Sequence, residues 1–212
     1  MTSDIQKIFD FIIELDKLKL VLRKTKPFGC GRYENSAEHS WQVCMLAVLL
    51  AKESPKPIDV VRAVELLLVH DIPEIDAGDQ IVYQGKDAPS IQAEKRAAER
   101  IFSLLPESHR SWCLVRWEEY EVRQTDEAIF AYAVDRLMPV LQNLNNSGQS
   151  WVENRVPLEK ILSVNAAIGN ALPSVWEYVQ SLIEKFNDSK LSSHTVVNAQ
   201  PFAQEGLATP AP

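Results

Sequence analysis

The sequence LLLVHDIPEIDAGD, residues 66–79, decides the fold because it carries an apolar helix directly into a cluster of ionisable side chains. The apolar run ends at His70 and Asp71, and Pro73 then interrupts the helix. Three more carboxylates follow before residue 80: Glu74, Asp76 and Asp79. Charges at the end of a buried helix cost free energy unless they are paired or bind a metal. This stretch therefore predicts a functional site, in which we interpret Asp76 as a turn residue.

Helical spacing of apolar residues recurs along the chain, and no segment alternates with period two. Asn35, Ser90 and Thr125 are expected to cap helices, and Pro157 suits a first helical position. Helices are predicted over residues 4–23, 36–52, 58–69, 90–105, 108–121, 125–141, 157–170 and 173–186, with loops over 24–32, 73–88 and 143–154. We therefore predict an all-α fold. It comprises one helical bundle domain over residues 1–187 and a disordered tail over 188–212, where small, polar and proline residues show no periodicity.

Composition places the chain among ordinary globular proteins. Apolar residues make up 46% of the sequence and charged residues 24%. A formal net charge of −7 is the opposite of the basic footprint of a dedicated nucleic-acid or anionic-membrane binder. A small anionic substrate remains compatible with this charge, because one local basic pocket would suffice to bind it.

Cysteine usage and the N-terminus bear on location. Cys30, Cys44 and Cys113 are odd in number and lack any CxxC spacing, which favours a reducing cytoplasm over a disulfide scaffold. The N-terminus lacks the charged and apolar regions of a signal peptide. No apolar run approaches the roughly 20 residues that span a bilayer. The sequence therefore predicts a soluble cytoplasmic protein with neither a membrane nor a nucleic acid as partner.

Two histidines are expected to meet in the fold. His39 lies in the first turn of the second predicted helix and His70 at the end of the third, so antiparallel packing would bring their rings together. Asp71 adjoins His70, and Asp135 lies in a later helical stretch with apolar flanks, where a buried carboxylate needs a cation or several donors. One divalent ion held by these four side chains would satisfy them all. The mixed nitrogen and oxygen set suits Mn²⁺, Co²⁺, Fe²⁺, Ni²⁺, Zn²⁺ or Mg²⁺.

Simpler interpretations of the same residues exist. His70 could cap the C-terminus of its helix beside a solvated Asp71, and Asp135 could form a surface ion pair with Arg136. The metal site is favoured over the helix cap and the surface ion pair, because one helical frame carries His39, the His70–Asp71 pair and Asp135.

The ordered set of these residues resembles the H…HD…D signature of the HD-domain metal-dependent phosphohydrolases, and is most similar to their bacterial 5'-deoxynucleotidase branch. The matching segments are Glu38–Trp41, His70–Glu74, Gly78–Asp79 and Asp135, supported by Leu18–Arg23 and Trp117–Glu121. The likeness covers roughly residues 5–186. It implies an HD-domain bundle with an irregular loop after the HD pair, a homodimer, and hydrolysis of a nucleoside 5'-monophosphate to a nucleoside and inorganic phosphate.

The resemblance also implies roles for individual residues. His39, His70, Asp71 and Asp135 would hold one divalent metal ion, and Glu74 would orient the attacking water or protonate the departing 5'-oxygen. Arg23 would bind the phosphate, and Asp79 would contact the sugar or orient a neighbouring group. Lys24 follows Arg23 where that branch has a tryptophan near the sugar. Lys24 is therefore a candidate substrate-binding residue, although a solvated side chain is the simpler interpretation, and sugar and base preference are not predicted.

Three alternatives stay open. A di-iron oxygenase or a cyclic-nucleotide phosphodiesterase on the same frame needs extra histidines between Asp71 and Asp135, where only His109 is available, so one metal ion is favoured. The enzyme could act on another small phosphate ester. The chain could also be a non-catalytic, nucleotide-binding regulatory protein, although the whole ligand set and Glu74 are present. The absence of an HExxH motif excludes a metalloprotease of that type.

Overall fold

The computed structural model describes residues 3–197, with side chains up to residue 189, and over this range the chain is helical without any strand. The α-helices are α1 (Asp4–Leu15), α2 (Ser36–Leu50), α3 (Val60–Val69), α4 (Glu74–Ala77), α5 (Ala88–Phe102), α6 (Glu107–Val122), α7 (Asp126–Asn145), α8 (Gln149–Glu153), α9 (Leu158–Asn165) and α10 (Pro173–Val197). Short 3-10 helices are η1 (Asp16–Leu20), η2 (Ala51–Glu53), η3 (Val82–Gln84) and η4 (Ala166–Asn170). The predicted all-α fold is confirmed.

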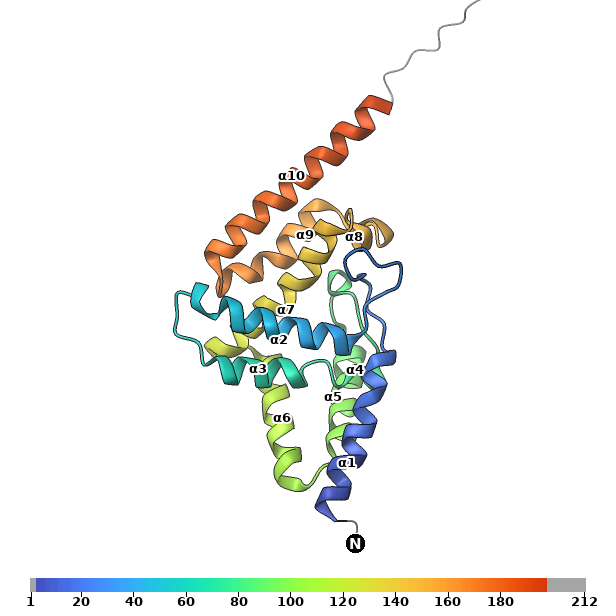
Figure 1. The fold of residues 1–212 in the computed structure, drawn as a ribbon, viewed down its shortest axis with the longest axis vertical. Helices are drawn as coiled ribbons and strands as arrows, with labels where there is room; N and C mark the ends of the chain where they lie inside the picture. Colours follow the sequence, from blue (N-terminus) through green and yellow to red (C-terminus); the bar gives the residue numbers. More distant parts are fainter. Residues whose placement is uncertain (1–2, 198–212) are drawn as a thin grey trace, which may run out of the picture.

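Figure 1 shows α2 and α3 crossing the middle of the molecule in opposite directions and in contact with α7. α1, α5 and α6 form the lower end, and α8, α9 and α10 form the upper end. Leu66, Leu67 and Phe130 lie in a core that joins α2, α3 and α7 to the C-terminal helices. Val69 and Ile72 belong to a second core, with α1, α5 and α6. The change from the first core to the second falls between Leu67 and Val69, so His70 and Asp71 follow directly after the boundary between the cores.

A capping box begins α2. The Asn35 side chain accepts the Glu38 backbone N–H at 3.0 Å, and the Glu38 carboxylate accepts the Asn35 backbone N–H at 3.3 Å. This reciprocal pair fixes the first turn, which carries His39. Thr125 caps α7 in the predicted way, because its hydroxyl accepts the Ala128 N–H at 3.2 Å.

Several predicted boundaries differ from the structure. The first helix gives way to the 3-10 segment η1 at Asp16, so the chain is extended before Arg23. The N-cap of α5 is Asp87 rather than Ser90, because the Asp87 carboxylate accepts the Ser90 N–H at 2.9 Å. α10 continues to Val197 instead of ending near residue 186.

The loop predicted over residues 143–154 holds the short helix α8. Asn143 accounts for it, because its side-chain oxygen accepts the N–H of Ser150 at 2.9 Å and of Trp151 at 3.2 Å. Gly148 allows the turn between them with a φ of 70°.

The C-terminal tail predicted from residue 188 begins inside α10, and residues 198–212 lie outside the described residues. The domain boundary at residue 187 stays a prediction. No described helix is both long and apolar enough to cross a membrane.

Candidate metal centre

The two predicted histidines meet at the centre of the molecule. His39 lies in the first turn of α2 and His70 follows the last turn of α3, and their ring centroids are 5.7 Å apart. Both rings are buried. The antiparallel packing of α2 and α3 expected from the sequence is the cause, since it puts the start of one helix beside the end of the other.

Asp135 of α7 completes a compact group with these rings. Its Oδ1 lies 2.8 Å from His39 Nε2 and 3.8 Å from His70 Nε2. One ligand atom from each of the three side chains falls within 4.8 Å of the others. Three buried donor atoms at this spacing, two nitrogen and one oxygen, can hold a divalent metal ion.

The second oxygen of Asp135 is engaged elsewhere. Tyr120 donates its hydroxyl to Oδ2 at 2.8 Å, and Arg136 donates from Nη2 at 3.0 Å. Burial alone would raise the pKa of Asp135, but Arg136 and His39 hold it well below its usual range. Asp135 is therefore an anion whose Oδ1 is directed at the histidines.

His70 is oriented by its own helix. Its Nδ1–H donates to the Leu67 carbonyl at 2.7 Å, so Nε2 is the ring nitrogen directed into the group. Nε2 is buried without a hydrogen-bond partner in the described structure. Burial alone would lower the pKa of His70, but the Asp71 and Asp135 carboxylates raise it to about 9. The surroundings thus favour a positive charge at this point, as a metal site requires.

Asp71 adjoins the compact group. Its Oδ1 is 3.0 Å from His70 Nε2, while its Oδ2 is 4.0 Å from His39 Nε2 and accepts a hydrogen bond from Arg23 Nη1 at 2.9 Å. One carboxylate oxygen thus faces the histidines and the other faces the arginine. Asp71 as a fourth ligand stays a prediction.

Arg23 is held among acids on the far side of Asp71. Its Nη1 lies 3.6 Å from Asp79 and its Nε lies 3.5 Å from Glu34. Burial alone would lower the pKa of Arg23, but Asp71 and Asp79 raise it above the usual value, so the guanidinium keeps its charge. A fixed, charged fork of donors in this position can bind phosphate oxygens.

Glu74 and Asp79 carry perturbed carboxyls beside this arginine. Burial and the charge of Asp71 raise the pKa of Glu74 well above its usual range, against the effect of Arg23. The Ser36 hydroxyl donates to Glu74 at 2.6 Å and fixes its side chain. Burial likewise raises the pKa of Asp79. A carboxyl with a raised pKa can act as a general acid.

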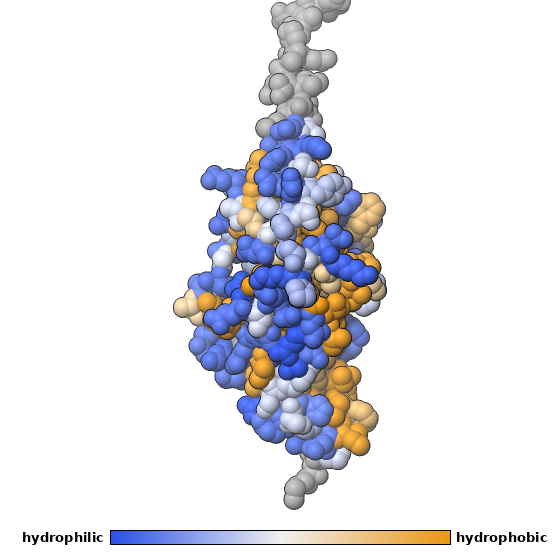
Figure 2. Space-filling view, turned by 90° about the vertical axis from the view of Figure 1, so that its left-hand side faces the viewer, coloured by the Kyte–Doolittle hydropathy of each residue, from blue (hydrophilic) through white to orange (hydrophobic). Residues whose placement is uncertain are grey.

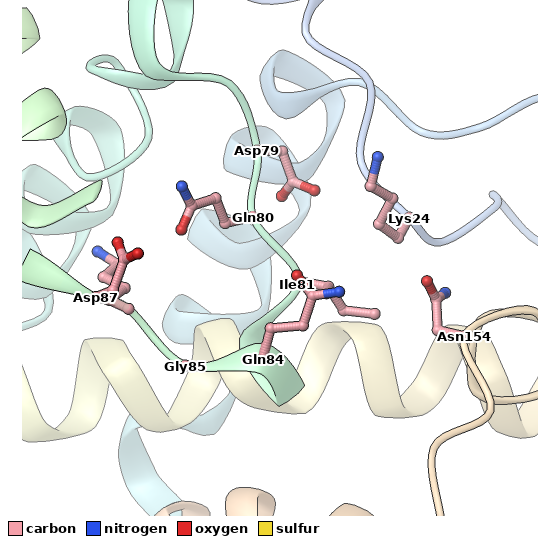
Figure 3. A pocket seen from close by; sticks show the side chains of 9 residues that line it. Lys24, Asp79, Gln80, Ile81, Gln84, Gly85, Asp87 and Asn154 are labelled. Atoms are coloured by element: carbon pink, nitrogen blue, oxygen red, sulfur yellow. The ribbon is translucent and has the colours of Figure 1, made fainter. Parts of the chain in front are cut away.

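A cleft of about 490 Å³ opens beside these groups. Its lining residues are Lys24, Asp79, Gln80, Ile81, Gln84, Gly85, Lys86, Asp87 and Asn154. Figure 3 shows Lys24 and Asp79 on the same side of the cleft, with Asn154 below Lys24. Asp79 is shared with the Arg23 group, so the cleft leads directly to the charged centre. Most of the lining residues are polar, Ile81 adds an apolar side chain, and none of them is aromatic.

The structure also contains site residues that the sequence did not indicate. Glu34 lies beside His39, and only tertiary packing reveals it. Tyr120 lies in the segment Trp117–Glu121 that supported the resemblance, but its contact with Asp135 was not predicted. Arg136 does pair with Asp135, but the pair is buried rather than on the surface. Asp76, interpreted as a turn residue, lies instead in the short helix α4, where its carboxylate accepts a hydrogen bond from Arg100 at 2.8 Å.

Comparison with known proteins agrees with this geometry. The sequence profile of the family described as HD domain matches residues 15–176. This chain belongs to the HD-domain family. A crystal structure named as a predicted metal-dependent phosphohydrolase, from Magnetospirillum magnetotacticum, is 35% identical with a TM-score of 0.83, covering 88% of this chain and 94% of that one.

Relatives of this HD-domain chain include 5'-deoxynucleotidases. HDDC2 from Homo sapiens is 30% identical over 141 residues, which are 65% of this chain and 67% of that protein. The Dictyostelium discoideum HDDC2 is 27% identical over 133 residues, which are 59% of this chain and 70% of that protein. The match to the Mus musculus protein spans 54% of its length. These likenesses support an HD-domain phosphohydrolase that uses a divalent metal ion.

Proposed function

We propose that this HD-domain phosphohydrolase removes the 5'-phosphate of nucleoside and deoxynucleoside 5'-monophosphates. The observation that carries the proposal is one continuous site. The His39–His70–Asp135 group is linked through Asp71 to Arg23, and Arg23 lies beside the raised-pKa carboxyl of Glu74 and beside Asp79. Asp79 lines a cleft of about 490 Å³, which is large enough for a nucleoside. The names of the HDDC2 relatives support the same substrate class.

His39, His70, Asp71 and Asp135 would hold the metal ion in this proposal. Mn²⁺, Co²⁺, Fe²⁺, Ni²⁺, Zn²⁺ and Mg²⁺ all suit the mixed donor set. A divalent ion here would lower the pKa of a bound water and neutralise charge on the phosphoryl group. The buried, partnerless Nε2 of His70 and the directed Oδ1 of Asp135 fit such an ion.

In this proposal Arg23 binds the phosphate, and Glu74 donates a proton to the leaving group. The Arg23 guanidinium binds non-bridging phosphate oxygens and orients the phosphorus toward the attacking water. A bond forms from the water oxygen to phosphorus while the bond from phosphorus to the 5'-oxygen breaks. Glu74 gives its proton to that leaving oxygen, so the nucleoside departs as an alcohol and inorganic phosphate remains.

Asp79 and Lys24 lie where the sugar would follow the phosphate. Asp79 can accept a hydrogen bond from a sugar hydroxyl, and the exposed Lys24 ammonium can donate one. The polar lining implies recognition by hydrogen bonds rather than by stacking on an aromatic ring. Ribose and deoxyribose are both within the proposal for that reason.

The proposal extends to a cytoplasmic homodimer. Cys30, Cys44 and Cys113 are free thiols, as expected in a reducing compartment. Figure 2 shows hydrophobic side chains along its right-hand edge, the face turned toward the viewer in Figure 1. Large exposed apolar side chains on α1, η1 and α2 are Ile5, Phe9, Ile12, Ile13, Leu20, Trp41, Met45, Val48 and Leu49. An apolar row this long is typical of a protein interface, and a second copy offers the same row.

A phosphate-release screen tests the proposed function. Purified protein loaded separately with each of the six metals would be given ribo- and deoxyribonucleoside 5'-monophosphates with each base, and, for comparison, non-nucleotide phosphate esters and cyclic nucleotides. We expect metal-dependent phosphate release from several of them. Binding of nucleotides without release under every metal would favour the regulatory alternative. Release only from non-nucleotide esters or cyclic nucleotides would favour another phosphohydrolase activity.

A further inference from the structure

Glu34 is a fully buried carboxylate next to the candidate metal centre. It lies in the segment just before α2, where its N–H donates to the Thr25 carbonyl and its carbonyl accepts the Arg23 N–H, both at 2.9 Å. Gln142 of α7 donates to Glu34 Oε1 at 2.5 Å. These contacts hold the side chain in place, although Glu34 takes no part in the proposed reaction.

The other oxygen of Glu34 faces two donors that lack any partner. Oε2 accepts a hydrogen bond from the Thr25 hydroxyl at 3.5 Å, and it also lies 3.6 Å from His39 Nδ1 and 3.5 Å from Arg23 Nε. In the described part of the chain, both nitrogens are buried without a hydrogen bond. Buried donors nearly always have an acceptor. A movement of a few tenths of an ångström would bring Glu34 Oε2 within hydrogen-bond distance of both nitrogens.

The chemistry of His39 makes that acceptor necessary. Its Nε2 faces Asp135 Oδ1 and His70, so binding a metal there requires a lone pair on Nε2. A neutral imidazole then carries its proton on Nδ1, and that N–H needs an acceptor. In His70, the Nδ1–H donates to the Leu67 carbonyl. For His39, Glu34 occupies the corresponding place.

We infer that Glu34 is a positioning residue that accepts the Nδ1–H of His39 and so presents Nε2 to the metal, while its same oxygen holds Arg23. The inference rests on the metal site of the proposed function. A carboxylate behind a metal-binding histidine fixes both the tautomer and the ring, and its loss typically weakens metal binding about 10–100-fold. Glu34 thereby links the metal side of the site to the phosphate side.

Metal affinity measures this role without any substrate. Co²⁺ would be titrated into metal-free wild-type protein, Glu34→Met and Glu34→Gln. Methionine has a similar length but no oxygen, so we expect its Kd for Co²⁺ to rise about 10–100-fold. Glutamine keeps one oxygen, and Gln142 can turn its amide to match, so Glu34→Gln should recover most of the affinity. Gln142→Met is the matched control, since it disturbs the same buried cluster but leaves Oε2 in place, and its Kd should stay within about twofold of wild type.

Nitrogen NMR of the histidines supplies a second readout. The protein would be labelled with ¹⁵N-histidine and loaded with Zn²⁺. The signal of His39 is the one that disappears in His39→Gln, and in wild type it should report a proton on Nδ1. That signal should lose its slowly exchanging proton in Glu34→Met. A role confined to stability would lower the melting temperatures of the Glu34 variants while leaving Co²⁺ affinity and tautomer unchanged, and that result would overturn the inference.

The outcomes separate this inference from the proposed function. If Glu34→Met does not fold, the wild-type NMR signal still decides, because a proton on His39 Nε2 in the zinc-loaded protein contradicts the inference. Wild-type protein that binds Co²⁺ but releases no phosphate would refute the nucleotidase and leave the Glu34 test intact. Wild-type turnover with unchanged Co²⁺ affinity in Glu34→Met would refute the Glu34 role alone.

Discussion

Arg23 Nη1 lies 2.9 Å from Asp71 Oδ2, so the proposed phosphate-binding residue is already paired with a predicted metal ligand. The other oxygen of Asp71 faces His70. Asp71 therefore stands between the metal side and the phosphate side of one site. The proposed catalysis depends on this arrangement, because a phosphate oxygen would meet the metal ion and the guanidinium together.

Arg23→Lys tests the fork. Lysine keeps the positive charge among Asp71 and Asp79 but loses the planar pair of donors. We expect kcat/KM for a nucleoside monophosphate to fall about tenfold or more, which is about 1.4 kcal/mol of transition-state binding. Arg100→Lys is the control, because Arg100 pairs with Asp76 away from the centre. Equal kcat/KM in Arg23→Lys and wild type would refute the phosphate contact.

His70→Ala tests the metal site. The substitution removes one of the few nitrogen ligands, so we expect purified protein to retain little metal by elemental analysis. His109→Ala should retain as much metal as wild type, since His109 is exposed at the start of α6. The same analysis of Asp71→Ala decides whether the adjoining carboxylate is a ligand. Full metal occupancy in both His70→Ala and Asp71→Ala would exclude the assigned site.

Glu74→Gln tests the general acid. The amide can still accept from Ser36, but it has no proton to give to the leaving oxygen. We expect metal content to stay and kcat to fall about 10²–10⁴-fold. Asp76→Asn, two residues later in α4, should keep kcat near wild type because Asp76 pairs with Arg100. An unchanged kcat in Glu74→Gln would remove the acid role from this residue.

Tyr120→Phe tests the support of Asp135. The change deletes one of the two donors to the buried Oδ2 and adds no bulk. A hydrogen bond to a charged group contributes about 1.5–3 kcal/mol, so we expect a loss of that size in the free energy of unfolding by urea. Tyr178→Phe is the matched control, because Tyr178 is 65% exposed. If both variants unfold at the same urea concentration as wild type, the hydrogen bond does not stabilise the fold.

Leu49→Lys tests the proposed dimer face. Leu49 is 65% exposed on α2, and a lysine pair brought together across an apolar interface would be unfavourable. Sedimentation equilibrium should show a dimer for wild type and a monomer for Leu49→Lys. Val152→Lys, at an equally exposed site on α8, should stay dimeric. A monomeric wild type would refute the homodimer.

The candidate metal-binding group was predictable because helix periodicity places its members. His39 follows an N-cap, His70 ends an apolar run, and Asp135 lies within a buried helix, so the local patterns imply both their positions and their need for a partner. Antiparallel packing of α2 and α3 then brings the two histidines together, as the sequence predicted.

The supporting residues were not predictable in the same way. Glu34 lies outside any helix, and its contacts with Arg23 and Gln142 depend on how the loop before α2 packs against α7. The side chain of Asn143 organises α8 across a turn that no periodic pattern marks. Such long-range hydrogen bonds are set by tertiary structure.

The most direct test of the central claim compares phosphate release with and without metal. Co²⁺-loaded wild-type protein, the same protein stripped by a chelator, and His70→Ala would each be given one deoxynucleoside 5'-monophosphate and its 3'-monophosphate isomer. The account predicts release from the 5'-isomer by the loaded wild type alone. Equal release by the stripped protein or by His70→Ala, or no release from the 5'-isomer by loaded wild type, would contradict it.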